Sequence, residues 1–174
     1  MVNKGKKNFE ESLLEVRRVT RVTTGGRRLG FRAVMVVGNQ NGKVWVGVWK
    51  AKDVIWAIKK SSHDAYKNIV EVPIQWADTV PYQIDHKYKA AQIRLIPASG
   101  GTGMKAGSAV RTVLELAGYN NILSKILGTN NKLNNALATI EALQSFKTGR
   151  YGQNFDDDTN KDEKEDKKKE NKDS

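Results

Sequence analysis

Arginine side chains are the first group in this sequence whose type and spacing could do chemistry. Six of them lie close together near the N-terminus: Arg17, Arg18, Arg21, Arg27, Arg28 and Arg32. No acidic residue occurs from Val16 to Lys52, so the adjacent sequence does not neutralise them. Because the planar guanidinium suits phosphate and like charges repel each other, the cluster predicts binding to a polyanion.

A pair of glycines lies in the middle of this cluster. The segment Thr24-Gly25-Gly26-Arg27 separates two stretches that are rich in β-branched and basic residues. Adjacent glycines accept a positive φ without steric cost, which a tight hairpin turn requires. The pattern therefore predicts a basic hairpin with its tip at Gly25 and Gly26, where a partner can come close to the backbone.

The flanking residues predict a small sheet with one helix behind it. Residues 16–24 are rich in Val and Thr, 28–33 alternate polar with apolar, and 43–50 read as a third strand. Phe9 to Glu15 is expected to form a short helical turn before the first strand. Asp53 is a suitable N-cap for a helix that ends near residue 70.

The faces of this helix are assigned from its spacing. The expected core stripe is Ile55, Ile58, Ala65 and Ile69, interrupted by Ser62. An adjacent stripe of Lys59, His63 and Lys67 has two interpretations, a solvated face or a face that follows phosphates. Its position beside a basic hairpin favours the second interpretation. Trp45 and Trp49 on the third strand are expected to pack, with base stacking as the less favoured alternative.

The net charge of +11 is unevenly distributed. Residues 151–174 carry six lysines and nine acidic residues, whereas the preceding 150 carry 24 basic and 10 acidic residues, a net +14. Such an excess predicts nucleic acid or an anionic membrane as partner. Apolar runs such as 33–37 are far shorter than the about 20 residues of a spanning helix, so no membrane partner is expected. A polar, basic start likewise predicts no signal peptide.

Nucleic acid is thus the favoured partner, and the predicted contact residues follow the basic cluster. They are Arg17, Arg18, Arg21, Gly25, Gly26, Arg27, Arg28, Arg32, Lys50, Lys52 and Lys59.

Enzymatic chemistry has little support in the residue types. The chain has no cysteine, and its two histidines, His63 and His86, are far apart in sequence. The carboxylates Glu10, Glu11 and Glu15 have no nearby histidine, cysteine or second acidic group with which to form an acid–base pair. We therefore expect no catalytic group, metal, cofactor or small-molecule substrate.

The second half of the chain predicts a further α/β unit. Pro73 and Pro81 bracket an expected boundary, and a strand is predicted within residues 88–97. The next helix should bury Ala109, Val110, Val113, Leu114 and Ala117 and end at Gly118. Tyr119 to Leu127 is predicted to give a short strand or turn. Asn131 should cap a last helix that bears Leu133, Leu137, Ile140 and Leu143 on one stripe.

These patterns divide the chain into four parts. We predict a basic arm over 1–15, a sheet-and-helix domain over 16–73, an α/β domain over 74–150 and a disordered charged tail over 151–174.

The glycine-rich segment before the predicted second helix has three interpretations. Gly101-x-Gly103-x-x-Ala106 fits a relaxed dinucleotide-binding fingerprint, but no second strand ending in Asp or Glu follows about 20 residues later. It also lacks the Gly-Lys-Ser/Thr of a phosphate-binding loop. The remaining interpretations are a tight strand-to-helix turn, which we favour, and an anion site at the helix N-terminus.

An ordered set of short motifs carries a family resemblance. The first half contains Arg18-Val19-Thr20, Gly25-Gly26-Arg27, Phe31-Arg32-Ala33, Val36-Val37-Gly38-Asn39, Gly42-Lys43 and Lys50-Ala51 with Val54. The second half contains Pro97-Ala98, Gly101-Thr102-Gly103, Ala106-Gly107, Val110-Arg111-Thr112-Val113-Leu114-Glu115-Leu116-Ala117-Gly118, Asn121-Ile122-Leu123, Gly128, Asn131, Ala138-Thr139-Ile140 and Ala142-Leu143. Over about residues 10–147 this set resembles the bacterial-type ribosomal protein S-five family of the small subunit.

The resemblance implies an α+β fold of two domains. The first would be a sheet with one packed helix, like a double-stranded-RNA-binding domain, and the second a β-α-β-α unit with a left-handed crossover. It also implies binding to small-subunit rRNA, roles in assembly and accuracy, and a place along the path by which mRNA enters. Ribosomal proteins S-four and S-eight would be neighbours, with Gly101, Thr102 and Gly103 near S-four.

The sequence departs from the family pattern at three points. Thr24 stands where a lysine usually precedes the glycine pair, Trp45 and Trp49 replace two glycines of a strand, and Ser99-Gly100-Gly101 is looser than usual. The body most resembles the cyanobacterial and plastid branch. This resemblance, with no transit peptide visible, implies the plastid stroma as the location, with bacterial cytoplasm as the alternative.

Two other functions remain as alternatives at this point. A free-standing regulator that binds double-stranded RNA would use the first domain but has no need of the second. A nucleotide-dependent enzyme would use Gly101 and Gly103 and should bind nucleotide saturably.

Overall fold

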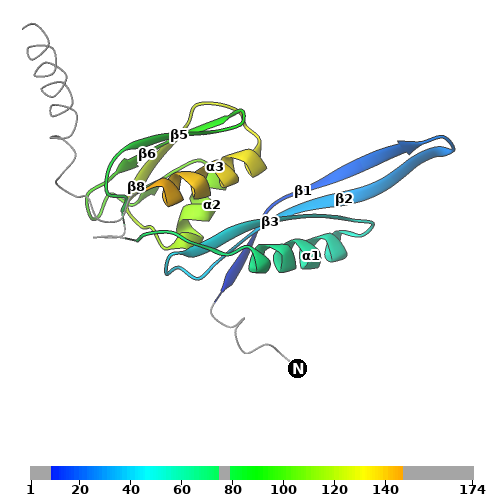
Figure 1. Ribbon diagram of the computed structural model, residues 1–174, viewed down its shortest axis with the longest axis horizontal. Helices are drawn as coiled ribbons and strands as arrows, with labels where there is room; N and C mark the ends of the chain where they lie inside the picture. Colours follow the sequence, from blue (N-terminus) through cyan, green and yellow to red (C-terminus); the bar gives the residue numbers. More distant parts are fainter. Residues whose placement is uncertain (1–8, 75–78, 147–174) are drawn as a thin grey trace, which may run out of the picture.

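The computed structural model describes residues 9–74 and 79–146, whose elements are arranged in successive layers (Figure 1). Helix α1 (Val54–Lys67) covers one face of the first sheet. Helices α2 (Ser108–Ala117) and α3 (Lys132–Ser145) lie between that sheet and a second one. The predicted α+β class is therefore confirmed. The predictions for residues 1–8 and for the tail over 151–174 lie outside the described residues.

The first sheet is an antiparallel arrangement of four strands in sequence order. These are β1 (Glu10–Thr23), β2 (Gly26–Gly38), β3 (Lys43–Ala51) and β4 (Val70–Glu71). Strand β3 ends at Ala51, which pairs with Phe31 of β2. Beyond this point only β1 and β2 continue, so residues 19–30 form a two-stranded arm that projects from the sheet (Figure 1).

The tip of the arm is the predicted glycine turn. Thr24 and Gly25 form the two-residue connection, and Thr23 pairs with Gly26 across it. Of the two glycines only Gly26 takes a positive φ, of 136°, which a residue with a Cβ rarely adopts. The Thr23 hydroxyl donates a hydrogen bond to the Gly26 carbonyl at 3.1 Å, which stabilises the turn.

The predicted helical turn over Phe9 to Glu15 is wrong. Strand β1 already begins at Glu10 and pairs with Gly38 at the far end of β2. A β-bulge between Leu13 and Glu15 adjusts the register along this stretch. Thirteen paired residues on the two sides of this bulge outweigh the weak local helical preference, because strand formation depends on cross-strand partners more than on intrinsic propensity.

Helix α1 begins as predicted after Asp53, although the Asp53 side chain makes no capping hydrogen bond. It ends at Lys67, earlier than predicted, because Val70 and Glu71 pair with β3 as strand β4. Of the predicted core stripe, Ala65 is buried, but Ile55 is wrong because it is 67% exposed. The other buried residues are the small side chains Ala57, Ser61 and Ser62. Small side chains let the helix lie close to the sheet.

The second sheet has the spatial order β5-β6-β8-β7. Its strands are β5 (Ile84–Tyr88), β6 (Ala91–Pro97), β7 (Met104–Lys105) and β8 (Ile122–Ile126). β7 and β8 are parallel and joined through α2, and the other neighbours are antiparallel. Strand β8 confirms the short strand expected within residues 119–127. Strand β5 was not predicted, because three of its five residues are polar.

Both later helices are capped as predicted. Gly118 ends α2 with a left-handed φ of 103°, and its N–H donates to the carbonyls of Leu114 and Glu115. All five residues of the predicted α2 core face are buried. The Asn131 side chain accepts the Leu133 N–H at 3.2 Å and starts α3. Ile140 and Leu143 of α3 are fully buried.

The two halves share one hydrophobic core. Val34, Val36, Val44 and Val46 of the first sheet belong to the same buried cluster as Leu114, Ile122 and Ile140 of the second half. The β2–β3 turn docks onto the end of α2, where Gln40 and Gly42 donate their N–H groups to the carbonyls of Leu116 and Ala117, each at 2.9 Å. This contact holds the first sheet in a fixed orientation on α2.

Glycine at position 47 sets the distance between β3 and α1. A Cβ there would meet the Ser61 carbonyl and the backbone N of Ala65. We predict that Gly47→Ala destabilises the fold by about 1–3 kcal/mol, the usual range for overpacking. At about 2–4 °C per kcal/mol for a chain of this size, thermal unfolding should report a clear loss.

The matched control for this substitution is Gly100→Ala. Gly100 has no heavy atom within 4 Å of its Cβ position, so Tm should hardly change. Equal Tm values for the two variants would contradict the close packing of α1 on β3.

Candidate nucleic-acid interface

Strand register divides the basic residues of the arm between two faces. Gly47 contacts α1 and lies opposite Met35, so odd-numbered residues of β2 share the α1 side and even-numbered ones point to the other side. Arg17 pairs with Arg32, Arg21 with Arg28, and Arg32 with Lys50. The side away from α1, called here the arginine face, therefore carries Arg17, Arg21, Arg28, Arg32 and Lys50.

The opposite side of the arm, called here the mixed face, combines two arginines with apolar side chains. Arg18 pairs with Phe31, Thr20 with Leu29, and Val22 with Arg27. Val22 is 75% exposed and Leu29 50% exposed. Large apolar side chains this exposed, placed beside arginines, are suited to a partner that offers both charge and apolar surface.

One carboxylate partly neutralises the arginine face. The Glu15 side chain lies 2.8 Å from Arg17 Nε and 3.5 Å from Arg32 Nη2, and it is only 10% exposed. The sequence reasoning missed this contact because Glu15 lies just before the stretch without acidic residues. The three-dimensional pairing brings it beside Arg32, which is seventeen positions away in the chain.

The cations nearer the tip have no such neutralisation. Arg21, Arg27 and Arg28 are exposed and form no ion pair with any residue of the described ranges. Arg21 and Arg28 lie directly opposite each other, an arrangement that destabilises a strand pair. An arm that projects from the core with unpaired guanidiniums becomes more favourable when phosphates approach it.

The three predicted lysines are placed at the base of the arm. Lys50 belongs to the arginine face through its pairing with Arg32. Lys52 lies exposed in the connection between β3 and α1. Lys59 lies on the exposed side of α1, with its ammonium 5.5 Å from the centroid of the Trp56 ring. The structure therefore groups the predicted contact residues around the arm and its base.

The tryptophans replacing glycines on β3 lie on the α1 side of the sheet. Trp45 and Trp49 flank Gly47, two positions away on either side, and so point to the same face as it does. Trp45 is half-buried and packs against the core, whereas Trp49 is 44% exposed. A more exposed tryptophan, Trp56 at 57%, was not singled out from the sequence, because it lies outside the expected core stripe of its helix.

The Gly101-Thr102-Gly103 segment is a tight turn whose amides are already engaged. Gly101 and Gly103 have left-handed φ values of 87° and 72°. Their N–H groups both donate to Oδ1 of Asn121, at 3.1 and 3.2 Å. Strand β7 separates this turn from α2, so the glycines do not open the helix as a dinucleotide fingerprint requires. This geometry favours the structural interpretation of the motif.

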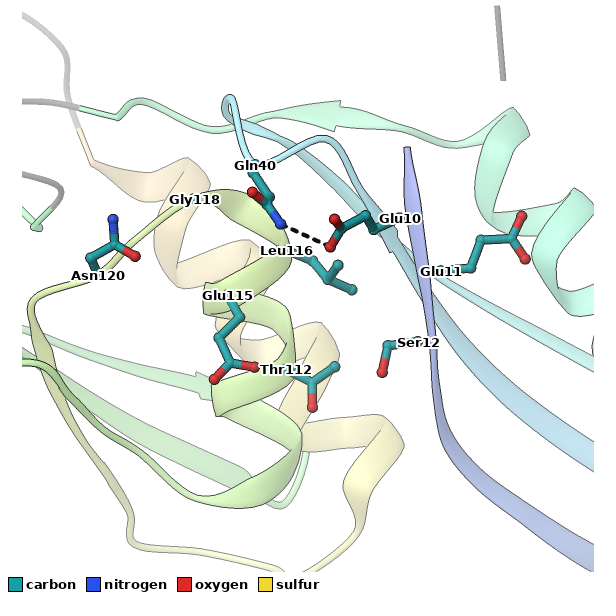
Figure 2. Close-up of a pocket in the computed structure, with 9 residues that line it drawn as sticks. All are labelled: Glu10, Glu11, Ser12, Gln40, Thr112, Glu115, Leu116, Gly118 and Asn120. Carbon is teal, nitrogen blue, oxygen red and sulfur yellow. Dashed lines mark hydrogen bonds between the residues drawn. The ribbon is translucent and has the colours of Figure 1, made fainter. Parts of the chain in front are cut away.

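A hollow of about 550 Å³ lies where β1 meets α2 (Figure 2). It is lined by Glu10, Glu11, Ser12, Gln40, Thr112, Glu115, Leu116, Gly118 and Asn120. Its three carboxylates already have hydrogen-bond partners: Glu10 accepts from Gln40 at 2.8 Å, Glu11 from Tyr66 at 2.9 Å, and Glu115 from Arg111 at 2.7 Å. This surface is acidic and is suited to repel a polyanion.

The contact between Glu11 and Tyr66 also ties β1 to α1. Burial, assisted by the hydrogen bond to Glu11, raises the pKa of Tyr66 to about 12. The phenol therefore stays a neutral donor throughout the physiological range. The carboxylates of Glu10 and Glu11, at the N-terminal end of β1, thus have structural partners.

The described part of the chain contains neither a metal-binding cluster nor a membrane-spanning helix. Across residues 9–74 and 79–146, no three His, Asp or Glu side chains gather in a way that would hold a metal ion. Over the same ranges, none of the helices has the length and apolar character needed to cross a bilayer.

Fold and surface together define a class of protein. A four-stranded sheet with one helix, a projecting basic arm and a mixed sheet with two helices define a two-part α+β protein with a basic surface. The family models agree with this class. "Ribosomal protein S5, N-terminal domain" matches residues 9–73, and "Ribosomal protein S5, C-terminal domain" matches residues 86–153.

Individual relatives give the same result. Small ribosomal subunit protein uS5 of Trichormus variabilis is 49% identical over 141 residues, which cover 81% of each chain. Small ribosomal subunit protein uS5c of Cyanophora paradoxa is 50% identical over 143 residues, which cover 82% of this chain and 85% of the relative. The uS5c protein of Spinacia oleracea is 52% identical over 139 residues, or 80% of this chain and 45% of the relative.

The chain belongs to the ribosomal protein S5 family, in its cyanobacterial and plastid branch. The predicted family and branch are confirmed. Membership makes the chain a ribosomal protein with a structural role, and it confirms the expectation that the protein is not an enzyme.

The Glu15 contact yields a prediction about the arginine face. Glu15→Gln keeps the shape of the side chain but removes the charge that competes with phosphate for Arg17 and Arg32. We expect tighter binding to a small-subunit rRNA fragment. The log–log salt dependence should steepen by about 0.7–0.9 for each arginine that gains a phosphate contact. Fluorescence anisotropy over a series of salt concentrations measures both quantities.

Glu115→Gln is the control for this measurement. It frees Arg111 in the same way but lies on α2, beside the hollow rather than on the arm. Its salt dependence should match that of the wild type. If Glu15→Gln also leaves the salt dependence unchanged, Arg17 and Arg32 do not meet phosphates.

Proposed function

We propose that this protein binds the rRNA of the small ribosomal subunit through its β1–β2 arm. The observation that carries the proposal is the projecting two-stranded arm, on which Arg21, Arg27 and Arg28 are exposed without an in-chain ion pair among the described residues. Binding would use phosphate and 2′-hydroxyl contacts and the shape of the RNA rather than base edges. Gly25 and Gly26 would let the backbone approach the RNA closely.

The family resemblance supports finer roles within the subunit. We propose that the protein supports subunit assembly and translational accuracy and lines the path along which mRNA enters. Ribosomal proteins S-four and S-eight are the proposed neighbours, with the Gly101-Thr102-Gly103 turn facing S-four. The rigidity of this turn supports it as a contact. The side chain of Asn121 accepts the N–H groups of Gly101 and Gly103, while Gly101 itself stays exposed.

The proposed location is the plastid stroma, within the ribosome. Relatives that carry the name uS5c in Cyanophora paradoxa and Spinacia oleracea support it. The cyanobacterial relatives support the alternative location, the bacterial cytoplasm.

A free-standing regulator that binds double-stranded RNA is the alternative function. It predicts that RNA binding needs only the first sheet and α1. The shared core argues against it, because residues of the second half complete the packing of the first sheet. A protein built only to bind duplex RNA has no need of that second half.

Sedimentation distinguishes the two functions. In a sucrose gradient of a gentle lysate at high salt, we expect the protein to migrate with small ribosomal subunits. A protein that runs free of subunits and still binds duplex RNA would support the regulator instead.

The arm itself is tested by the variant Arg27→Ala/Arg28→Ala. Loss of two phosphate contacts should weaken binding to small-subunit rRNA and flatten the log–log salt dependence by about 1.4–1.8. Anisotropy titrations at several salt concentrations provide both values.

The control is Arg94→Ala/Arg111→Ala, which removes the same number of arginines. Both are held by carboxylates of this chain, Arg94 by Asp85 at 2.6 Å and Arg111 by Glu115 at 2.7 Å. Their loss should leave the salt dependence nearly unchanged. Equal effects of the two double variants would mean that total charge, and not the arm, governs binding.

A further inference from the structure

Two large apolar side chains at the start of α1 are exposed. Ile55 is 67% exposed and its neighbour Trp56 is 57% exposed. Both would contribute to stability if they were buried, since each is a large hydrophobic side chain. Two consecutive large apolar side chains left exposed at the start of one helix make this surface a candidate contact site.

The fold itself prevents these residues from reaching the core. The helix face that meets the sheet consists of Ala57, Ser61 and Ala65, and Gly47 of β3 fits directly against it. Because this contact has room only for small side chains, α1 cannot rotate to bury Trp56. The exposure of Trp56 is therefore a fixed property of the structure.

The surface around Trp56 is basic. Lys59 is one turn further along α1, and its ammonium lies over the indole ring, 5.5 Å from the centroid. Lys52 and Lys60 are exposed nearby in the chain, and Asp53 is the single acidic residue from 52 to 63. An aromatic ring among lysines matches a base that stacks while its phosphates are neutralised.

The patch of Lys52, Ile55, Trp56, Lys59 and Lys60, called here the Trp56 patch, lies at the base of the arm. β3 ends at Ala51, opposite Phe31, and α1 begins three residues later. Figure 1 shows α1 beginning at the end of the sheet from which the arm projects. The mixed face, with Arg18 and Arg27, is on the same side of the sheet as α1.

We propose that the Trp56 patch binds an unpaired RNA nucleotide, whose base stacks on the indole of Trp56 while Lys59 and its neighbours hold the adjacent phosphates. Bases within a duplex are stacked on each other and cannot offer a face to a side chain, so the ligand is single-stranded. Lys52, Lys59 and Lys60 favour RNA over a protein surface, because they would leave a protein partner with three cations to neutralise.

This inference goes beyond the proposed function. The arm would contact phosphates whether or not the bases are paired, whereas the Trp56 patch selects unpaired nucleotides. The two surfaces use different residues, so each can fail without the other.

The test compares Trp56→Ala, Trp56→Phe and Ile55→Ala in the full-length chain. The probes are a fluorescent oligouridylate of about ten nucleotides and an RNA duplex of similar charge, each titrated by anisotropy. Stacking of one base contributes roughly 5- to 150-fold in affinity. We expect Trp56→Ala to weaken oligouridylate binding by about tenfold or more and duplex binding by less than twofold.

The other variants separate stacking from general apolar contact. Trp56→Phe keeps an aromatic ring and should retain most of the affinity. Ile55→Ala removes apolar surface from the patch but no stacking face, so it should lose less affinity than Trp56→Ala. Oligouridylate should also quench tryptophan fluorescence more in the wild type than in Trp56→Phe. Thermal unfolding of each variant checks the fold, and Trp56→Phe keeps the comparison informative if Trp56→Ala is less stable.

Several results would overturn the inference. One is a Trp56→Ala variant that binds oligouridylate as tightly as the wild type. Another is an equal loss for single strand and duplex. A third is unchanged RNA binding with weaker incorporation into small subunits, which would assign the patch to a protein neighbour.

The variant Arg27→Ala/Arg28→Ala is included to keep the two proposals distinct. If it binds the duplex as tightly as the wild type while Trp56→Ala loses affinity for oligouridylate, the proposed role of the arm is wrong and the proposal for the Trp56 patch is supported. If only the arm variant loses affinity for the two RNA probes, the proposed role of the arm is supported and the proposal for the Trp56 patch is wrong.

Discussion

Close packing on both faces of the first sheet is the constraint on which the rest of the structure depends. Gly47 lets α1 lie directly on one face, and Gly38 contacts the backbone of Leu116 in α2 on the other. A side chain at either position would push a helix away from the sheet. Because β2 and β3 are held from both sides, the arm that continues from β1 and β2 extends from a rigid base.

A rigid base matters because the arm has little stability of its own. A two-stranded hairpin is marginal in water, and this one places Arg21 opposite Arg28. Carboxylates that could neutralise the tip of the arm lie elsewhere. Glu15, at the base of the arm, pairs with Arg17 and Arg32, and Glu10 and Glu115 line the hollow on the α2 side. Within the described residues, the exposed arginines near the tip of the arm are therefore separated in space from the carboxylates that line the hollow between β1 and α2.

The sequence predicts the position and the buried face of an element well where large apolar residues on one face form its contact with the core. The stripe of Val110, Val113 and Leu114 and the stop at Gly118 placed α2 correctly, because apolar spacing and a left-handed glycine are both local signals. The core face of α1 could not be predicted in this way. Its contact with Gly47 selects small residues, so Ile55, the more hydrophobic side chain, is the exposed one.

The candidate site shows the same division between local and distant causes. The composition of residues 17–32 was enough to predict a basic arm, yet its two faces follow from a register that only pairing defines. The influence of Glu15 on Arg32 depends on that pairing, as does the position of α1 at the base of the arm. Trp56 and Lys59 share a helix in the sequence, but only the fold shows that the strand before this helix ends at the base of the arm. Distance in the fold, more than residue type, therefore separates a solvated helix face from an RNA-binding one.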